Sequence, residues 1–113
     1  MKRALWLGVA LASAATCATH GFVLVSGESM SPALRMGDVC VYRRNAPVEV
    51  GDVVVYRRAD GARVVHRVIG VGQRGELRTK GDASTLADRD VVPAHDVAGP
   101  VIVRVPMAVM RAN

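Results

Sequence analysis

The sequence predicts a mainly β domain, built as a small antiparallel sheet or partial barrel and preceded by one N-terminal transmembrane helix. Three observations predict this. Residues 4–25 carry no formal charge and are largely apolar. Valine is abundant after residue 38, often in alternation with polar residues, which favours strands. An Asp60-Gly61 pair separates two such stretches, as in a β-hairpin. A chain of 113 residues has room for one small domain.

The uncharged run of residues 4–25 is long enough to cross a bilayer, because its residues, rising about 1.5 Å each in a helix, span roughly 30 Å of hydrocarbon. Lys2 and Arg3 precede the run, so the N-terminus is expected in the cytoplasm and the rest of the chain on the extracytoplasmic side. Small residues after this basic start leave a cleaved signal peptide open: Ala14, Ala15 and Ala18. Hydrophobicity continues through residues 22–25, which favours an uncleaved anchor over residues 1–25 and a β domain over 26–113.

The expected strands follow the valine pattern. They cover residues 39–44, 52–58, 63–71 and 76–80, and two closing strands are expected over 91–93 and 97–105. Turn-forming residues separate them at 45–47, 59–62 and 72–75, and a polar loop covers 81–90. Prolines at 93, 100 and 106 are expected to limit the closing strands to edges or ends of the sheet.

The charge and the ligand-forming residues exclude several classes of function. The formal net charge is +5, and paired arginines stand at 43–44 and 57–58. No aromatic stacking platform accompanies these pairs, so nucleic-acid binding is not expected, and a basic face beside anionic lipid headgroups explains them better. Two cysteines and three histidines are scattered without metal-ligand spacing, so neither a metal nor a cofactor is predicted.

Three short motifs occur in a fixed order. They read Gly27-Glu28-Ser29-Met30-Ser31-Pro32 with Gly37-Asp38 behind it, then Val64-Val65-His66-Arg67-Val68-Ile69-Gly70, then Lys80-Gly81-Asp82. This order resembles the type I signal peptidase family. Histidine in the second motif makes the chain similar to the branch of the endoplasmic-reticulum enzyme and its bacterial relatives. The resemblance covers roughly residues 4 to 92, and three ordered motifs are more specific than one.

The resemblance implies a catalytic serine with a histidine base. A serine hydroxyl needs a base to remove its proton, and the matching positions are Ser29 and His66. An acid should orient the imidazole, and placement on the third motif implies Asp88, with Asp82 as a supporting residue of the site. Here the chain departs from its relatives: Ala83 and Ser84 replace two asparagines, and Ala87 replaces an aspartate. Both Asp82 and Asp88 therefore remain candidates for the acid.

The resemblance also implies where a substrate binds. The backbone N–H of Ser29 would stabilise the oxyanion, and Gly27 stands where some relatives carry a serine whose hydroxyl helps. Met30 would line the site. An extended peptide would lie between the segment before Ser29 and the strand of Val64 and Val65, with small residues such as alanine at the first and third positions before the cut.

The expected function is that of a membrane-bound serine endopeptidase that cleaves signal peptides from exported preproteins. Two alternatives remain open. One is a specialised processing peptidase that serves a single substrate or a conjugation system. The other is an inactive, membrane-tethered module that binds peptides without cutting them. Only residues 67–79 separate His66 from the third motif, a near-minimal core that could require an unknown partner subunit.

Overall fold

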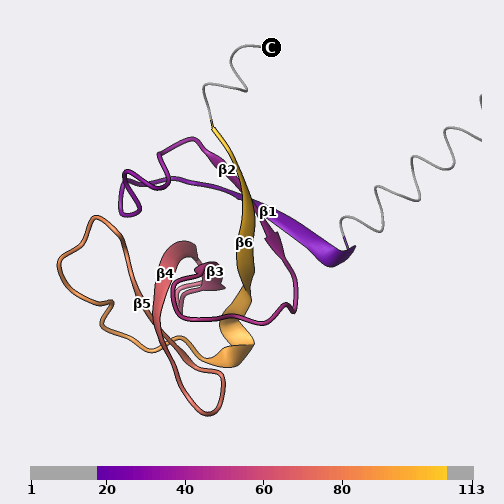
Figure 1. Ribbon diagram of the computed structural model, residues 1–113, viewed down its shortest axis with the longest axis vertical. Helices are drawn as coiled ribbons and strands as arrows, with labels where there is room; N and C mark the ends of the chain where they lie inside the picture. The colour runs from indigo at the N-terminus through magenta and orange to yellow at the C-terminus, as the bar shows by residue number, and fades with distance from the viewer. Residues whose placement is uncertain (1–17, 107–113) are drawn as a thin grey trace, which may run out of the picture.

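Six strands form one antiparallel sheet in the computed structural model, which describes residues 18–106 (Figure 1). The strands are β1 (His20–Leu24), β2 (Val39–Arg43), β3 (Val53–Arg57), β4 (Arg63–Val71), β5 (Leu77–Lys80) and β6 (Val97–Val105), and a 3₁₀ helix covers Ala94–Asp96. Their order in the sheet is β1-β2-β6-β3-β4-β5, and every neighbouring pair is antiparallel. The predicted mainly β, antiparallel class is confirmed.

The hairpin predicted around Asp60-Gly61 is confirmed. β3 and β4 pair from Val53↔Arg67 to Arg57↔Arg63, and Arg58 N–H donates to the carbonyl oxygen of Ala62 at 2.8 Å. Gly61 has a φ of 87°, a conformation that glycine adopts without steric cost. The hairpin fixes the register of β4 and therefore the face on which His66 lies.

Strand β1 corrects part of the predicted membrane helix. The sequence predicts residues 20–24 as part of that helix, but they form an edge strand that pairs with β2 from His20↔Arg43 to Leu24↔Val39. An uninterrupted apolar run has no periodicity that separates a helix from a buried or half-buried strand. The rest of the predicted helix, residues 4–17, lies outside the described residues. No helix within residues 18–106 has the length and apolarity needed to cross a membrane.

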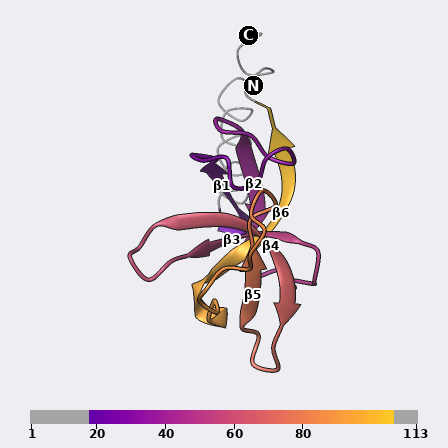
Figure 2. The same cartoon turned by 90° about the vertical axis from the view of Figure 1, so that its left-hand side faces the viewer.

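Strand β6 corrects the expectation that prolines confine the closing strands to edges or ends. β6 lies between β2 and β3 near the centre of the sheet, with β1 and β2 in one half of the molecule and β5 in the other (Figure 2). Its first half pairs with β3 and its second half with β2. Pro100 lies at the end of the pairing with β3, next to the point where the pairing with β2 begins. Its missing N–H therefore removes no hydrogen bond from the middle of either pairing.

The prediction of a strand over residues 91–93 is wrong. Among the described residues Val92 forms one isolated bridge, with Leu77, and Pro93 has no N–H with which to extend it. The bridge nevertheless matters, because Val92 and Leu77 exchange two backbone hydrogen bonds of 2.8 Å. It holds the segment that follows the polar loop 81–90 against β5.

Two buried clusters form the core, one on each side of β4. The first contains Val54, Tyr56, Val68, Leu77 and Val92, with Val64 packed against it. The second contains Val25, Met30, Leu34 and Cys40, with Val65 packed against it. Successive side chains of a strand point to opposite faces, so Val64 and His66 share the first face and Val65 lies on the second.

Candidate active site

Ser29 lies on the loop that connects β1 and β2. The base of the loop is closed by two backbone hydrogen bonds, from Val25 N–H to Asp38 O at 2.8 Å and from Gly37 N–H to Val25 O at 2.7 Å. Met30, next to the serine, is 1% exposed and anchors the loop in the second core cluster. The loop thus buries its apolar side chains and leaves Ser29 at the surface.

An ion pair between the loop and the sheet adds to this support. The Asp38 carboxylate accepts from Arg104 Nε on β6 at 2.9 Å and from the N–H of Arg35 at 2.9 Å. The Asp38 side chain is only 3% exposed. A buried carboxylate is tolerated only when it is paired in this way, so Asp38 and Arg104 tie the loop to β6.

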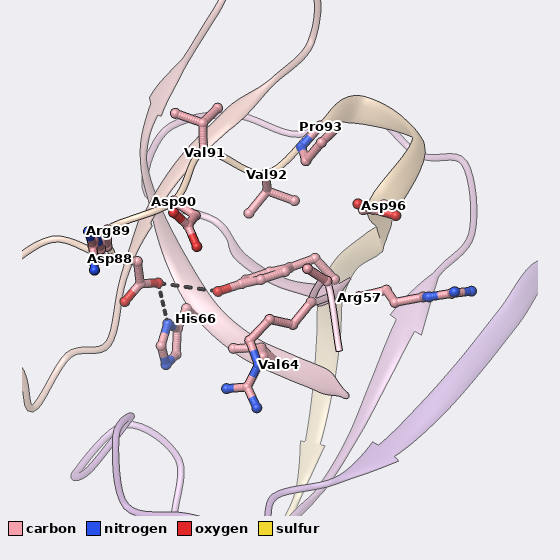
Figure 3. Close-up of a pocket in the computed structure, with 13 residues that line it drawn as sticks. Arg57, Val64, His66, Asp88, Arg89, Asp90, Val91, Val92, Pro93 and Asp96 are labelled. Atoms are coloured by element: carbon pink, nitrogen blue, oxygen red, sulfur yellow. Dashed lines mark hydrogen bonds and ion pairs between the residues drawn. The ribbon is translucent and has the colours of Figure 1, made fainter. Parts of the chain in front are cut away.

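Ser29, His66 and Asp88 form a continuous chain of polar contacts. His66 Nε2 lies 3.1 Å from Ser29 Oγ, and His66 Nδ1 lies 2.5 Å from Asp88 Oδ2 (Figure 3 shows the second contact). The His66 and Asp88 side chains are 15% and 25% exposed. A carboxylate at Nδ1 favours the tautomer with its proton there, which leaves the lone pair of Nε2 facing the serine hydroxyl.

Asp88 is held by two further donors that the sequence analysis did not identify. Its Oδ2 accepts from Thr79 Oγ1 at 2.7 Å and from the Tyr56 hydroxyl at 3.2 Å. The backbone also contributes, because Asp88 N–H donates to Thr79 O at 2.8 Å. The sequence held one signal for Thr79. It follows Leu77 by two residues on a short strand, so the two side chains share a face. A hydroxyl that faces the core with Leu77 requires a hydrogen-bond partner.

These contacts set the ionisation of Asp88 and Tyr56. Burial raises the pKa of Asp88, but the hydrogen bonds from His66 and Thr79 outweigh it, and the net pKa is below the ordinary value. Burial raises the pKa of Tyr56; the hydrogen bond with Thr79 opposes this, and the charge of Asp88 adds to it. Asp88 therefore stays ionised as an acceptor while Tyr56 keeps its proton as a donor.

Asp82 lies apart from this chain. Its two carboxylate oxygens accept from Arg67 Nε at 2.9 Å and from the Arg67 terminal nitrogen at 2.8 Å. The hydrogen bond with Arg67 holds the pKa of Asp82 below its ordinary value, although burial opposes it. Asp82 N–H also contacts Met30 Sδ at 3.4 Å. Of the two candidate acids, Asp88 lies against His66. Asp82 pairs instead with Arg67 and so joins the third motif to β4.

Gly81 lies where the third motif meets the other two. A Cβ built on Gly81 would lie 2.8 Å from Ser29 O, 3.2 Å from Ser29 Cβ and 3.3 Å from His66 Nε2. The next loop residues hold the serine from the same side, because Ala83 N–H donates to Ser29 O at 2.8 Å. Only glycine allows this close approach without a shift of backbone.

A cleft of about 380 Å³ runs beside Ser29 and His66. One wall consists of residues 23–27 with Ser29 and Met30, and the other of residues 62–66. The predicted binding residues Gly27, Met30, Val64 and Val65 therefore all lie in this one cleft. Whether the N–H of Ser29 stabilises an oxyanion stays a prediction. Within residues 18–106, no group of three or more His, Cys, Asp or Glu side chains could hold a metal ion.

Comparison with known proteins agrees with this geometry. The family model described as Peptidase S24-like matches residues 6–102, which is most of the chain. No curated protein matches the sequence closely enough to be a relative. The match covers the positions of Ser29, His66 and Asp88. The chain therefore belongs to the Peptidase S24-like family and carries its serine peptidase domain.

Proposed function

We propose that this protein is a membrane-bound serine endopeptidase that cleaves signal peptides from exported preproteins, on the extracytoplasmic side of the bilayer. Ser29 is the nucleophile, His66 the general base and Asp88 the acid that orients the imidazole. The observation that carries the proposal is the contact chain from Ser29 Oγ to His66 Nε2 at 3.1 Å and from His66 Nδ1 to Asp88 at 2.5 Å.

The geometry supports a two-step acyl transfer. His66 Nε2 takes the proton of Ser29 while Oγ attacks the scissile carbonyl, since a base must lie within hydrogen-bond reach of the proton that it removes. Asp88 stabilises the imidazolium that forms. The imidazolium then gives its proton to the leaving amine, and the acyl group stays on Ser29. In the second step His66 takes a proton from water, whose oxygen attacks the ester carbonyl. The bond between the acyl carbon and Ser29 Oγ then breaks, His66 returns the proton to Oγ, and the carboxylic acid leaves.

Two strand edges support binding of an extended peptide. β1 is an edge strand, and β5 pairs with β4 only from Arg67 to Val71, so residues 63–66 of β4 have one side without a strand partner among the described residues. These two edges face each other across the cleft. A peptide laid there can pair its backbone with either edge regardless of its side chains. Its small residues at the first and third positions before the cut would face Met30 and Val65.

The outer face of β1, β2 and β6 supports a position at the bilayer. Cross-strand partners point to the same face of a sheet, and two rows of partners are entirely apolar: Phe22, Val41 and Val103, and Leu24, Val39 and Val105. Phe22 is 70% exposed and Leu24 is 61% exposed. An exposed apolar face of this kind typically marks a surface that binds a protein or a membrane.

The length of the N-terminal apolar segment makes this face important. With β1 beginning at His20, sixteen uncharged residues, 4–19, precede the sheet. At about 1.5 Å per residue a helix of that length spans roughly 24 Å, less than the 30 Å of bilayer hydrocarbon. We propose that the segment and the outer sheet face together hold the domain at the membrane. Flotation with anionic vesicles tests this: Phe22→Glu with Val103→Glu should reduce binding, and Ile69→Glu on β4 should not.

Cleavage of a preprotein tests the catalytic assignment. The full chain in detergent is incubated with a preprotein whose signal peptide ends in Ala-X-Ala, beside Ser29→Ala, His66→Ala and the control His95→Ala, whose side chain is 81% exposed. Loss of cleavage in the first two variants alone is expected. Cleavage that survives either of them refutes the assignment of Ser29 and His66. An inactive parent that still binds the peptide favours a binding module.

A further inference from the structure

A second cavity lies beside the catalytic chain and is not used by the proposed mechanism. It has a volume of about 390 Å³ and opens between the β3–β4 hairpin and residues 88–93 (Figure 3). It shares Arg58, Val64 and His66 with the substrate cleft, so the two spaces meet at the catalytic histidine. A side chain of a bound peptide could pass from the cleft into this cavity without leaving the active site.

One part of this cavity, its floor, is apolar and belongs to a buried core cluster. Tyr56, Val64 and Val92 supply the inner surface, and Figure 3 shows the Val92 side chain directed into the space. Tyr56 and Val92 are 6% and 5% exposed and belong to the same core cluster. The bridge between Val92 and Leu77 holds Val92 in place against β5. Charged residues line the rest of the cavity: Arg57, Arg58, Arg89, Asp90 and Asp96. An apolar side chain can pack only against the floor, which Tyr56, Val64 and Val92 form.

The faces of β4 indicate which substrate side chain would enter. Val65 packs with Met30 in the second core cluster, whereas Val64 packs against the first, on the face of His66 and of this cavity. A peptide extended beside β4 also alternates its side chains between these faces. Residues one and three before the cut would point toward Met30 and Val65. The second residue before the cut and the first residue after it would then point toward Val64, His66 and the cavity.

We propose that this cavity is a specificity pocket for a medium-sized apolar substrate side chain on the face opposite the two small residues, at the second position before the cut or the first position after it. This inference rests on the proposed function. When a substrate side chain fills an apolar pocket, each additional buried methylene group raises kcat/KM by roughly 10-fold or more. A peptide with leucine at the preferred position should therefore have a kcat/KM higher by at least about that factor than the same peptide with alanine. The peptide with glutamate there should be cleaved poorly.

Two variants that change the cavity in opposite directions test the inference. Val92→Ala widens it, and Ala59→Phe, at an exposed residue of its rim, narrows it. Two peptide series carry alanine, leucine or phenylalanine at one or the other position, and kcat/KM is measured for each. Val92→Ala should shift the preference toward phenylalanine in one series, and Ala59→Phe should shift it toward alanine in the same series.

Matched controls separate the pocket from general damage. Val54→Ala removes the same atoms from the same core cluster outside both cavities, and Ala94→Phe adds the same ring at an exposed site outside both. Neither should change the ratio of the leucine and alanine rates. Equal shifts in the controls, or no shift with either series in Val92→Ala and Ala59→Phe, overturn the inference.

Binding distinguishes failure of this inference from failure of the proposed function. Dissociation constants of the same peptides are measured by calorimetry with Ser29→Ala, which cannot cleave them. A preference for leucine in binding, changed by Val92→Ala and Ala59→Phe, supports the pocket even if the parent protein shows no peptidase activity. Efficient cleavage by the parent without any preference at either position leaves the peptidase assignment intact and refutes the pocket.

Discussion

Replacing Gly81 by alanine would test how closely the third motif approaches the catalytic serine. The added Cβ would lie 2.8 Å from the carbonyl oxygen of Ser29 and 3.3 Å from His66 Nε2. The first distance is shorter than a carbon and a backbone oxygen can maintain, so one of the two segments must move. Ser29 and Gly81 both belong to loops, and the loop of Ser29 is the one that carries the nucleophile.

The size of the effect follows from the required movement. Restoring an ordinary separation of about 3.4 Å needs a shift of several tenths of an ångström, and a misplacement near 1 Å in an active site costs about 100-fold in rate. We expect kcat to fall roughly 10- to 100-fold. The free energy of unfolding should fall by about 1–3 kcal/mol, as in other overpacked sites.

The assay is steady-state cleavage of a peptide with alanine at the first and third positions before the cut, together with thermal unfolding. Gly70→Ala serves as the control, because its Cβ would meet the nearest atoms, those of the Arg78 side chain, at 3.6 Å, an ordinary contact. Gly81→Ala with both kcat and stability unchanged would refute the idea that glycine is required there. A loss of stability with full activity would place the movement in the third motif and not in Ser29.

Three further outcomes follow from the polar contacts around the site. Arg104→Met removes one partner of the Asp38 carboxylate, which is 3% exposed. We expect unfolding in urea to show a loss of about 2 kcal/mol in the free energy of unfolding, a figure discounted because Arg104 itself is 38% exposed. Thr79→Val keeps the shape but removes the 2.7 Å donor to Asp88; stability should fall by about 1–2 kcal/mol, and kcat should fall while KM stays constant. Acid should destabilise the parent more than Asp88→Asn. The pKa of Asp88 is lower in the folded than in the unfolded protein, so the ionised carboxylate stabilises the folded state. This stabilisation is fully present above the unfolded pKa of about 3.9, and it is lost as the pH falls through the folded pKa.

Each of these outcomes has a result that contradicts it. Arg78→Met, at an exposed arginine of β5, is the control for Arg104, and equal losses in the two would mean that the buried pair contributes nothing. A normal kcat in Thr79→Val would show that Asp88 needs no second donor. A difference in melting temperature between the parent and Asp88→Asn that stays constant from pH 6 to pH 2 would contradict the lowered pKa of Asp88.

The local features of this protein could be predicted from its residues alone. Alternating valines and the Asp60-Gly61 turn predicted β3, β4 and the hairpin that joins them, because strand period and turn chemistry act over a few residues. The order of the three motifs identified Ser29 and His66, since a motif records residue type and spacing. These inferences needed no knowledge of how distant segments meet.

The three-dimensional structure was needed for the features that depend on contacts between distant segments. It separated Asp88 from Asp82, because one carboxylate meets His66 and the other meets Arg67, and both lie in a polar loop whose path the sequence does not reveal. It added Tyr56 as a donor thirty-two residues from its acceptor. It also turned residues 20–24 from the expected helix into β1. An apolar run has the same composition in either state, and pairing with β2 selects the strand.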